Sequence, residues 1–422
     1  MERLPGFRDF YPEPLPSRDA GWSFEARQYV FNKWRETARR YGFREYDGPP
    51  LESLELFTTK SGDEIVGQLY NFTDKGDRAV ALRPEMTPTL VRMIAAHERN
   101  YKKPIKWFAI PQLFRYERQQ KGRLREHFQF NADLIGEADP AADAELIALL
   151  IDTLRAFGLT EQDFVIRLSS RNAWHEFYEG RRQKAEARSD ADHEYEFFQT
   201  IDKLERTPPE ESEKKLATLG SSLADVNQFI ESGKPTTELQ SILDNLTARG
   251  LREYVKVDYH VIRGLAYYTG VVFEAFDKKA EFRAIAGGGR YDNLVKLISG
   301  GKVDLPALGF GMGDVVLLEL LKARSLLPKF AAVVDVFVLI EDESLRDQSL
   351  KLIHDLRAAG NVVEYSLTPA KADKQFKRAQ ELRAAFTVKF ESDLKARVKN
   401  LKTREENIVA IGEAVTLLKR EL

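Results

Sequence analysis

The sequence predicts an α+β protein with a helical insertion and a small α/β domain at its C-terminal end. Three observations lead to this fold class. Segments 66–83 and 105–135 have the pattern of paired strands, residues 170–250 are highly charged and helix-prone, and residues 333–422 alternate between strand and helix patterns. At this length we expect about two to three domains.

Residues 22–157 contain two helix patterns in addition to the two strand pairs. Residues 22–41 carry apolar side chains at helical spacing. Segment 66–83 is expected to form a strand, a turn at Asp74-Lys75-Gly76 and a second strand. Residues 139–157 predict a helix that begins at Asp139-Pro140 and ends before Gly158.

The remaining segments separate into an insertion and a terminal domain. Within 170–250, Pro208-Pro209 interrupts a charged helical pattern. Beyond Pro328, a strand is predicted at 334–340, a helix at 344–359 and a second strand at 362–365. This alternation is typical of a small α/β domain.

The charge of the chain is nearly balanced but locally uneven. A net charge of −2 excludes a uniformly basic nucleic-acid binder. Residues 371–404 nevertheless hold eleven Lys and Arg against four Asp and Glu. This segment is either a solvated helix face or a surface for phosphate groups.

Several kinds of protein and site are excluded by composition. The chain has no cysteine, which removes disulfides, iron–sulfur clusters and thiol nucleophiles. The six histidines lack ligand spacing, so no metal site is predicted. There is no apolar run of membrane-spanning length, no signal peptide, no G-x-S-x-G elbow and no Walker A loop. We therefore expect a soluble cytoplasmic protein.

Polar residues alternate along the second strand of segment 105–135. Five of them share one face, while phenylalanine, alanine and leucine occupy the other. These five are Arg125, His127, Gln129, Asn131 and Asp133. Arg115 and Glu117 are two apart and are expected to share a strand face nearby. An exposed sheet face is the alternative, but this mixture of cations, amide and carboxylate favours a ligand pocket in which arginines bind phosphate.

Three glycine-rich segments follow. Residues 263–270 and 286–292 combine glycines with arginine and tyrosine, and residues 309–314 read Gly-Phe-Gly-Met-Gly-Asp. Such glycines allow close backbone approach, although alone they usually indicate tight turns. The third segment lacks the spacing of a dinucleotide fingerprint, so we reject that function for it.

Taken together, these motifs resemble the histidyl-tRNA synthetase family of class II aminoacyl-tRNA synthetases. The resemblance covers nearly the whole chain. Gly6-Phe7-Arg8-Asp9 and Pro49-x-x-Glu52 match its start and its first motif. The other matching segments are Leu82-Arg83-Pro84-Glu85-Met86-Thr87, Phe114-Arg115-Tyr116-Glu117 with Gln120–Glu126, Arg263-Gly264-Leu265-x-Tyr267-Tyr268 and Gly288-Gly289-Arg290-Tyr291-Asp292.

The resemblance implies an architecture. Residues 1–328 would form a class II catalytic domain, an antiparallel sheet flanked by helices, with the helical insertion at about 170–250. Residues 331–422 would form the α/β anticodon-binding domain. A homodimer is also implied, because class II sites lie beside a two-fold interface.

The implied reaction has two steps. L-Histidine and ATP give histidyl-adenylate and pyrophosphate, and the histidyl group then passes to the 3′ end of tRNA(His). Mg²⁺ would bridge ATP oxygens rather than occupy a protein cage. By the same resemblance, Arg115 and Arg263 would be catalytic at the α-phosphate, Glu117 would contact the adenine amino group, and Arg123 would reach the outer phosphates.

The resemblance also implies a histidine pocket. Glu85 and Gln129 would bind the ammonium group, Asp133 and Tyr268 the ring nitrogens, and Tyr291 would close the pocket. A pocket of this kind rejects amino acids that lack an imidazole, because its buried polar groups would stay unpaired.

Three positions depart from the family pattern. Asp133 stands where glutamate is common, Ala266 where aspartate is common, and Val316 where the third class II motif has an arginine for the ATP γ-phosphate. Two alternatives follow. One is the synthetase-like regulatory subunit of ATP phosphoribosyltransferase in histidine biosynthesis, against which the C-terminal domain argues. The other is a tRNA-binding protein with an inactive adenylation site.

Overall fold

The computed structural model describes residues 2–12, 23–58, 67–117, 124–181, 190–262, 267–330, 334–391 and 394–421. The chain divides into two compact units, Met1–Leu327 and Pro328–Leu422. Each is described by itself below. None of the helices in these ranges combines the length and apolar character that a membrane crossing needs.

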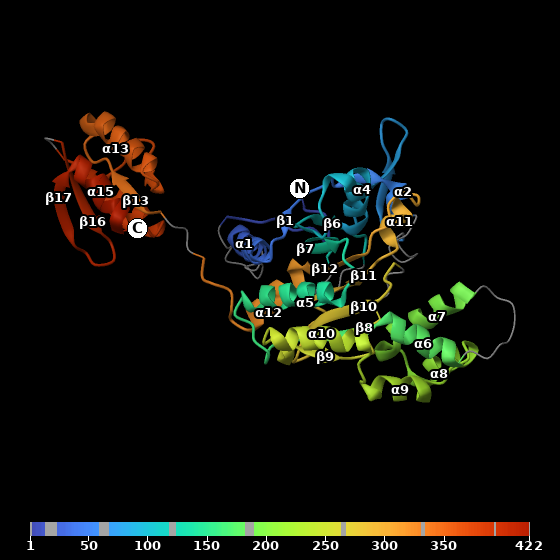
Figure 1. Cartoon of the computed structure of the whole chain (residues 1–422). Helices are drawn as coiled ribbons and strands as arrows, with labels where there is room; N and C mark the ends of the chain where they lie inside the picture. Colours follow the sequence, from blue (N-terminus) through green and yellow to red (C-terminus); the bar gives the residue numbers. More distant parts are fainter. Residues whose placement is uncertain are drawn as a thin grey trace. The chain divides into compact units, whose positions relative to one another are not determined.

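The described part of the first unit is built on a nine-stranded, mostly antiparallel sheet (Figure 1). Only the outer pairs β1–β5 and β8–β9 are parallel. The strand order is β1 (Arg44–Glu45), β5 (Ile105–Ala109), β7 (Glu126–Ile135), β12 (Ala307–Gly313), β11 (Ala286–Arg290), β10 (Val271–Asp277), β8 (Phe164–Ser170) and β9 (Val255–Val257), and β6 (Gln112–Phe114) also pairs with β7. The sheet and its helices confirm the predicted α+β class.

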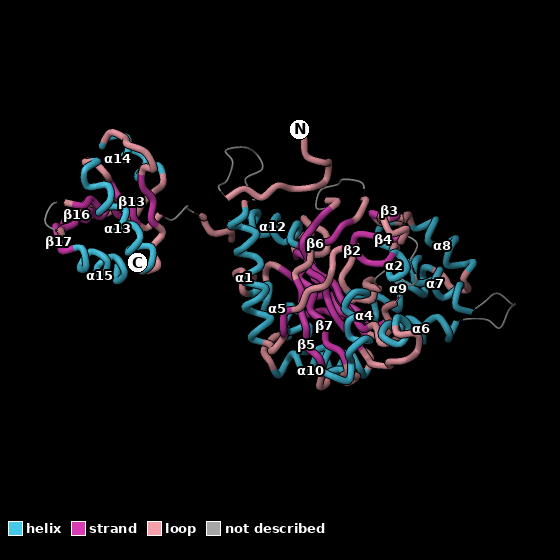
Figure 2. The backbone as a smooth tube through the Cα atoms, turned by 90° about the horizontal axis from the view of Figure 1, so that it is seen from above, coloured by secondary structure: helices cyan, strands magenta, loops and turns pink. Residues whose placement is uncertain are grey.

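Helices and a small sheet cover the faces of the large sheet (Figure 2). α1 and α5 lie on one side of it, and α4 lies on the other. The covering elements are α1 (Phe24–Arg40), α2 (Leu54–Thr58), α4 (Thr87–His97), α5 (Pro140–Arg155), α11 (Leu294–Ile298), α12 (Asp314–Ala323) and the sheet β2 (Leu51–Ser53), β4 (Ala79–Leu82) and β3 (Tyr70–Thr73).

Local sequence explains where the two long helices begin. The Ser23 hydroxyl accepts a hydrogen bond from the Ala26 amide at 3.1 Å and caps α1. Asp139 caps α5 in the same way at 2.8 Å from the Ala141 amide, and Pro140 occupies the first turn. Within α1, the fully buried Trp34 stacks on Phe130 of β7 with ring centroids 5.7 Å apart. This packing fixes which face of β7 is the core face.

The charged segment between β8 and β9 is helical, as its composition predicts. Its elements are α6 (Arg171–Arg181), α7 (Asp190–Asp202), α8 (Pro209–Thr218), α9 (Leu223–Ser232) and α10 (Thr237–Ala248). Aromatic side chains form the centre of this group, where Trp174 contacts Phe177, Phe197 and Phe229. In Figure 1, α6 to α9 lie together beyond the end of β8.

The second unit has a five-stranded sheet and its own apolar core. β13 is parallel to both β14 and β15, whereas β16 and β17 are antiparallel. The elements are β13 (Val336–Leu339), α13 (Arg346–Ala358), β14 (Val363–Tyr365), α14 (Ala372–Glu381), β15 (Phe386–Phe390), β16 (Lys395–Asn400), β17 (Glu406–Ala410) and α15 (Ile411–Glu421). Short 3₁₀ turns lie at 98–100, 204–206, 252–254 and 343–345.

Candidate active site

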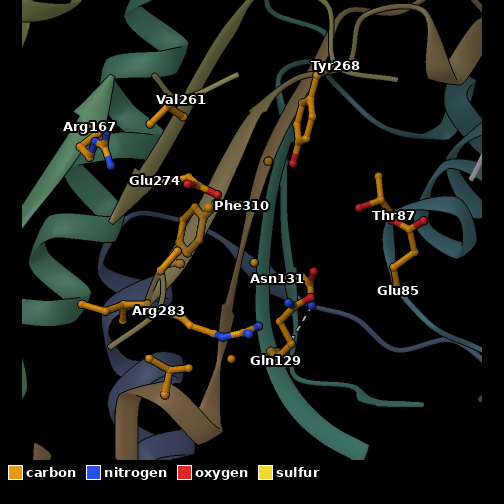
Figure 3. Close-up of a pocket in the computed structure, with 18 of the residues that line it drawn as sticks. Glu85, Thr87, Gln129, Asn131, Arg167, Val261, Tyr268, Glu274, Arg283 and Phe310 are labelled. Carbon is orange, nitrogen blue, oxygen red and sulfur yellow. Dashed lines mark hydrogen bonds between the residues drawn. The ribbon is translucent and has the colours of Figure 1, made fainter. Parts of the chain in front are cut away.

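A cavity of about 630 Å³ opens on the face of the large sheet that lies away from α1 (Figure 3). Polar side chains from several strands converge in it, which is typical of a site for a polar ligand. The residues that the following paragraphs use are Glu85, Thr87, Arg115, His127, Gln129, Asn131, Asp133, Arg167, Tyr267, Tyr268, Glu274, Arg283, Tyr291, Gly309, Gly311 and Val316.

The alternation predicted for β7 is present in the structure. Its odd-numbered residues from 127 to 133 line the cavity. Phe128 and Phe130 lie on the other face, where they pack against Phe31 and Trp34 of α1. A one-residue change of register would exchange these two faces, so the packing on α1 places the polar side chains in the cavity.

Arg115, Glu117 and Arg125 lie differently from the expectation. β6 ends at Phe114, so Arg115 and Glu117 follow the strand instead of sharing its face. Arg125 precedes β7 and is absent from the cavity lining, and its guanidinium lies 4.1 Å from the centre of the Tyr116 ring. The alternation therefore fails where pairing with the neighbouring strand ends.

Asp133 has one satisfied and one unsatisfied carboxylate oxygen. The Tyr291 hydroxyl donates to Oδ1 at 2.6 Å. Oδ2 is buried and has no hydrogen-bond partner among the described residues. Burial raises the pKa of Asp133 to about 7, although the hydrogen bond from Tyr291 opposes the shift. A ligand that brings an N–H group to Oδ2 would therefore satisfy a buried acceptor.

Glycines of β12 make room for the polar side chains of β7. Gly309 pairs with Asp133 and Gly311 with Asn131 in the antiparallel register. A Cβ on Gly309 would clash with Oδ1 of Asp133. A Cβ on Gly311 would lie 2.7 Å from the side-chain carbonyl carbon of Gln129. The glycine-rich segment is thus the floor of the cavity.

Glu85 and Arg115 line the cavity near the N-terminus of α4. The Glu85 side chain is buried, and the Tyr267 hydroxyl donates to its Oε2 at 2.8 Å. Arg115 donates from Nε to the carbonyl of Pro84 at 2.9 Å. This bond ties the segment after β6 to the residue before Glu85, so an anion-binding cation and a carboxylate are held close to one another.

His127 is uncharged at neutral pH. Burial, together with the positive charges of Arg115 and Arg8, lowers the pKa of His127 from 6.5 to about 3. A neutral imidazole adds no positive charge beside Arg115, and it can donate one hydrogen bond and accept another.

Arg290 holds the end of β11 in place. Its Nε donates to Oδ2 of Asp143 in α5 at 2.9 Å, and both side chains are buried. It also donates to the carbonyls of Glu137 and Asp139. The residue after it, Tyr291, is therefore fixed against Asp133.

Six of the nine predicted site residues line this one cavity. They are Glu85, Arg115, Gln129, Asp133, Tyr268 and Tyr291. Glu117 is not among the lining residues. Arg123 and Arg263 lie outside the described residues.

Sequence reasoning missed other cavity residues. Thr87, Arg167, Tyr267, Glu274 and Arg283 also line the cavity. Tyr267 and Thr87 lie in motifs given above, so their closeness in sequence to Tyr268 and Glu85 could have predicted that they line the cavity. Arg167, Glu274 and Arg283 carry no motif, and only the pairing of β8, β10 and β11 brings them here. The described residues contain no cluster of three or more potential metal ligands.

Two family models match the chain. The model described as histidyl-tRNA synthetase matches residues 22–314. The model described as anticodon binding domain matches residues 334–421. Together they cover most of both compact units.

Curated relatives and solved structures agree with these matches. The chain is 46% identical to a histidine–tRNA ligase of Opitutus terrae over 97% of this chain and 96% of the relative. It is 36% identical to one of Leptospira biflexa over 100% and 98% of the two chains. The apo histidyl-tRNA synthetase of S. aureus superposes with a TM-score of 0.70 at 25% identity, covering 99% of this chain and 100% of that one. The Nostoc sp. enzyme, with a TM-score of 0.78 at 22% identity over 100% and 99% of the chains, shares the fold.

Proposed function

The chain belongs to the histidyl-tRNA synthetase family and is a histidine–tRNA ligase, and from this premise we propose that the cavity beside β7 is where histidine and ATP react. The observation that carries the proposal is the buried Oδ2 of Asp133, which has no hydrogen-bond partner in the described part of the chain and faces a cavity whose wall includes Gly309. An imidazole N–H satisfies such an acceptor. The regulatory-subunit alternative is not favoured, because the cited relatives are histidine–tRNA ligases and the match covers nearly the whole length of both chains.

The histidine end of the cavity lies between β7 and β11. Asp133 accepts from one ring nitrogen, and the Tyr268 hydroxyl pairs with the other. Tyr291 closes the pocket and, through its 2.6 Å hydrogen bond, orients the Asp133 carboxylate. Glu85 and Gln129 take the ammonium group, since a buried carboxylate and an amide oxygen both accept from it.

The ATP end rests on cations. Arg115 binds the α-phosphate, where its planar fork matches two phosphate oxygens. Arg263 acts at the same phosphate and at the histidine carboxylate, Arg123 binds outer phosphates, and Glu117 contacts the adenine amino group. The last three roles rest on the motifs, because Glu117 is not among the lining residues and Arg123 and Arg263 lie outside the described residues.

The chemistry needs positioned charge more than a general base. A carboxylate oxygen of histidine attacks the α-phosphorus, the bond to the bridging oxygen breaks, and pyrophosphate leaves with that oxygen. A ribose hydroxyl at the 3′ end of tRNA(His) then attacks the histidyl carbonyl carbon, AMP leaves, and the hydroxyl proton is released. Arginines aimed at the phosphates stabilise the charge that builds up in the first step.

Mg²⁺ accompanies ATP in this proposal. Mg²⁺ usually keeps phosphate and water oxygens as ligands, so ATP itself would supply ligands that side chains would otherwise provide. When bound, it neutralises phosphate charge. Further parts of the proposal are a cytoplasmic homodimer and binding of the tRNA(His) anticodon by residues 331–422, with 1–328 as the catalytic domain.

ATP–pyrophosphate exchange with each of the twenty amino acids tests the proposal on purified protein without tRNA. Exchange with histidine alone is expected, and it would also show that Val316 leaves the adenylation site active. Absence of exchange together with measurable histidine binding would contradict adenylation in this cavity.

A further inference from the structure

The first turn of α12 presents an apolar residue to the cavity. Val316 lies there, two residues after Asp314, and it lines the cavity. The Asp314 carboxylate is buried and held by Arg8, whose Nη1 donates to it at 2.8 Å and whose Nε donates to Glu126 at 2.6 Å. Because Arg8 is fixed by two buried carboxylates, this corner of the cavity needs another source of positive charge if a polyphosphate is to lie against it.

Three arginines line the cavity within the part of the chain that the structure describes: Arg115, Arg167 and Arg283. Arg167 donates to Asp258 at 2.8 Å and to Glu205 at 2.9 Å, and these bonds tie its side chain to the segment after β9 and to the helical insertion. Arg115 donates to the Pro84 carbonyl and lies close enough to His127 to lower its pKa, and the proposed function assigns it to the α-phosphate. Arg283 is the exposed member of the three.

Strand pairing places Arg283 near the beginning of α12. It lies in the connection between β10 and β11, three residues before Ala286. Ala286 pairs with Met312, and α12 begins two residues after Met312. Figure 3 shows the Arg283 side chain extending across the cavity toward Gln129.

The connection that carries Arg283 is held to α12. Arg324, at the other end of that helix, donates to Asp277 at 2.6 Å and to Glu281 at 3.0 Å. The Ile285 amide donates to the carbonyl of Ala275 at 2.8 Å. The backbone on both sides of Arg283 is therefore anchored, which reduces the cost of holding a long side chain over the cavity.

We propose that Arg283 binds the terminal phosphate of ATP, supplying from the β10–β11 connection the positive charge that the first turn of α12 does not supply at Val316. This inference rests on the proposed function of the cavity. A guanidinium pairs with two phosphate oxygens at once and keeps its charge at every working pH. It binds the phosphates that leave as pyrophosphate, so it acts on ATP and not on the adenylate.

The test compares ATP with a ligand that has no outer phosphates. In Arg283→Ala, we expect the KM for ATP to rise about 10- to 100-fold in histidine-dependent exchange, the loss typical of one charged hydrogen-bonding group. The KM for pyrophosphate in the reverse direction should rise as well. Binding of a non-hydrolysable histidyl-adenylate sulfamoyl analogue should stay within about twofold of wild type. If Arg283 only supported the structure, its loss would weaken the binding of ATP and of the analogue to a similar extent.

A relocated arginine sharpens the test. Val316→Arg added to Arg283→Ala should recover most of the lost ATP affinity, because the charge returns to the same corner of the cavity. Arg99→Ala is the matched control, because Arg99 is an exposed arginine of the same unit and is absent from the cavity lining. It should leave every parameter unchanged.

Two results would overturn the role of Arg283. One is an unchanged KM for ATP in Arg283→Ala, and the other is an equal loss of ATP and analogue binding. A wild-type protein without exchange would instead reject the proposed adenylation. In that case the ATP dissociation constants of wild type and Arg283→Ala, measured by calorimetry, decide the question, and equal constants reject the inference.

Discussion

Asp133 shows how a single side chain can be costly for folding and useful for binding. Its carboxylate is buried, one oxygen is paired with Tyr291 and the other has no partner among the described residues. An unsatisfied buried acceptor costs free energy in the ligand-free protein. The cost is recovered when a donor arrives, so the site discriminates against ligands without that donor.

Replacing Asp133 with asparagine should weaken histidine binding in a pH-dependent way. Loss of a charge-assisted hydrogen bond predicts a KM for histidine about 10- to 100-fold higher than wild type above neutral pH. Because the pKa of Asp133 is raised to about 7, the wild-type carboxyl becomes neutral below that pH and the advantage over asparagine shrinks. The KM for histidine of Asp133→Asn divided by that of wild type, measured by exchange between about pH 6 and pH 8, should rise with pH. A constant ratio would contradict the assignment.

The same substitution should stabilise the ligand-free protein at neutral pH. The folded-state pKa of Asp133 lies above its ordinary value of 3.8, so the folded state holds a proton that the unfolded state has lost. Between about pH 4 and pH 7 the wild type therefore loses about 1.4 kcal/mol per pH unit relative to Asp133→Asn. Above pH 7 the difference levels off.

Urea unfolding followed by tryptophan fluorescence measures this difference. All four tryptophans lie within residues 1–327, so the signal reports on the unit that contains Asp133. A difference between the two proteins that is independent of pH would show that Asp133 is ionised in the folded state throughout this range.

At the scale of single elements, β7 was largely predictable and its partners were not. The alternation from His127 to Asp133 follows from a period of two and needs no knowledge of the neighbours. Arg115 and Glu117 were misplaced because the end of β6 depends on how far it pairs with β7. Arg283 could not be found, since its place over the cavity comes from the pairing of β11 with β12.

The glycines of β12 are the clearest case of an element whose role depends on its neighbour. Gly309→Ala would drive a methyl group against Oδ1 of Asp133 and displace the carboxylate from Tyr291. We expect at least about a tenfold rise in the KM for histidine, comparable to losing the charged hydrogen bond itself. Circular dichroism should show retained secondary structure.

Gly180→Ala in α6 is the control, because a Cβ there meets nothing within 4 Å. It should leave the KM for histidine at the wild-type value and can raise stability slightly by favouring helix. If Gly309→Ala also kept the wild-type KM, the carboxylate would have another productive position, and the proposed contact with the imidazole would be wrong.

At the scale of the whole molecule, the chain forms two compact units that divide at Pro328, and the assignment of 1–328 and 331–422 as functional domains stays a prediction. The alternation after Pro328 and the basic segment 371–404 both fall in the second unit. What the basic segment forms was not predictable. Its residues contribute to a cavity of about 770 Å³ whose lining includes Phe376, Arg383, Lys399, Lys402 and Arg404. An aromatic ring with several cations suits an unpaired nucleotide base and its phosphates.

Removing two of these cations should therefore weaken tRNA charging and spare amino-acid activation. Lys402 and Arg404 are exposed at the rim of this cavity. In the double variant Lys402→Ala/Arg404→Ala, the slope of log KM for tRNA against log salt should fall by about 1 to 2, because each phosphate contact releases counterions. Histidine-dependent exchange should match wild type, since the reacting cavity belongs to the other unit.

Lys351→Ala, an exposed lysine of α13 paired with Asp355, should change neither assay. An unchanged salt slope in the double variant would mean that the basic segment is a solvated face and that tRNA meets another surface of the protein.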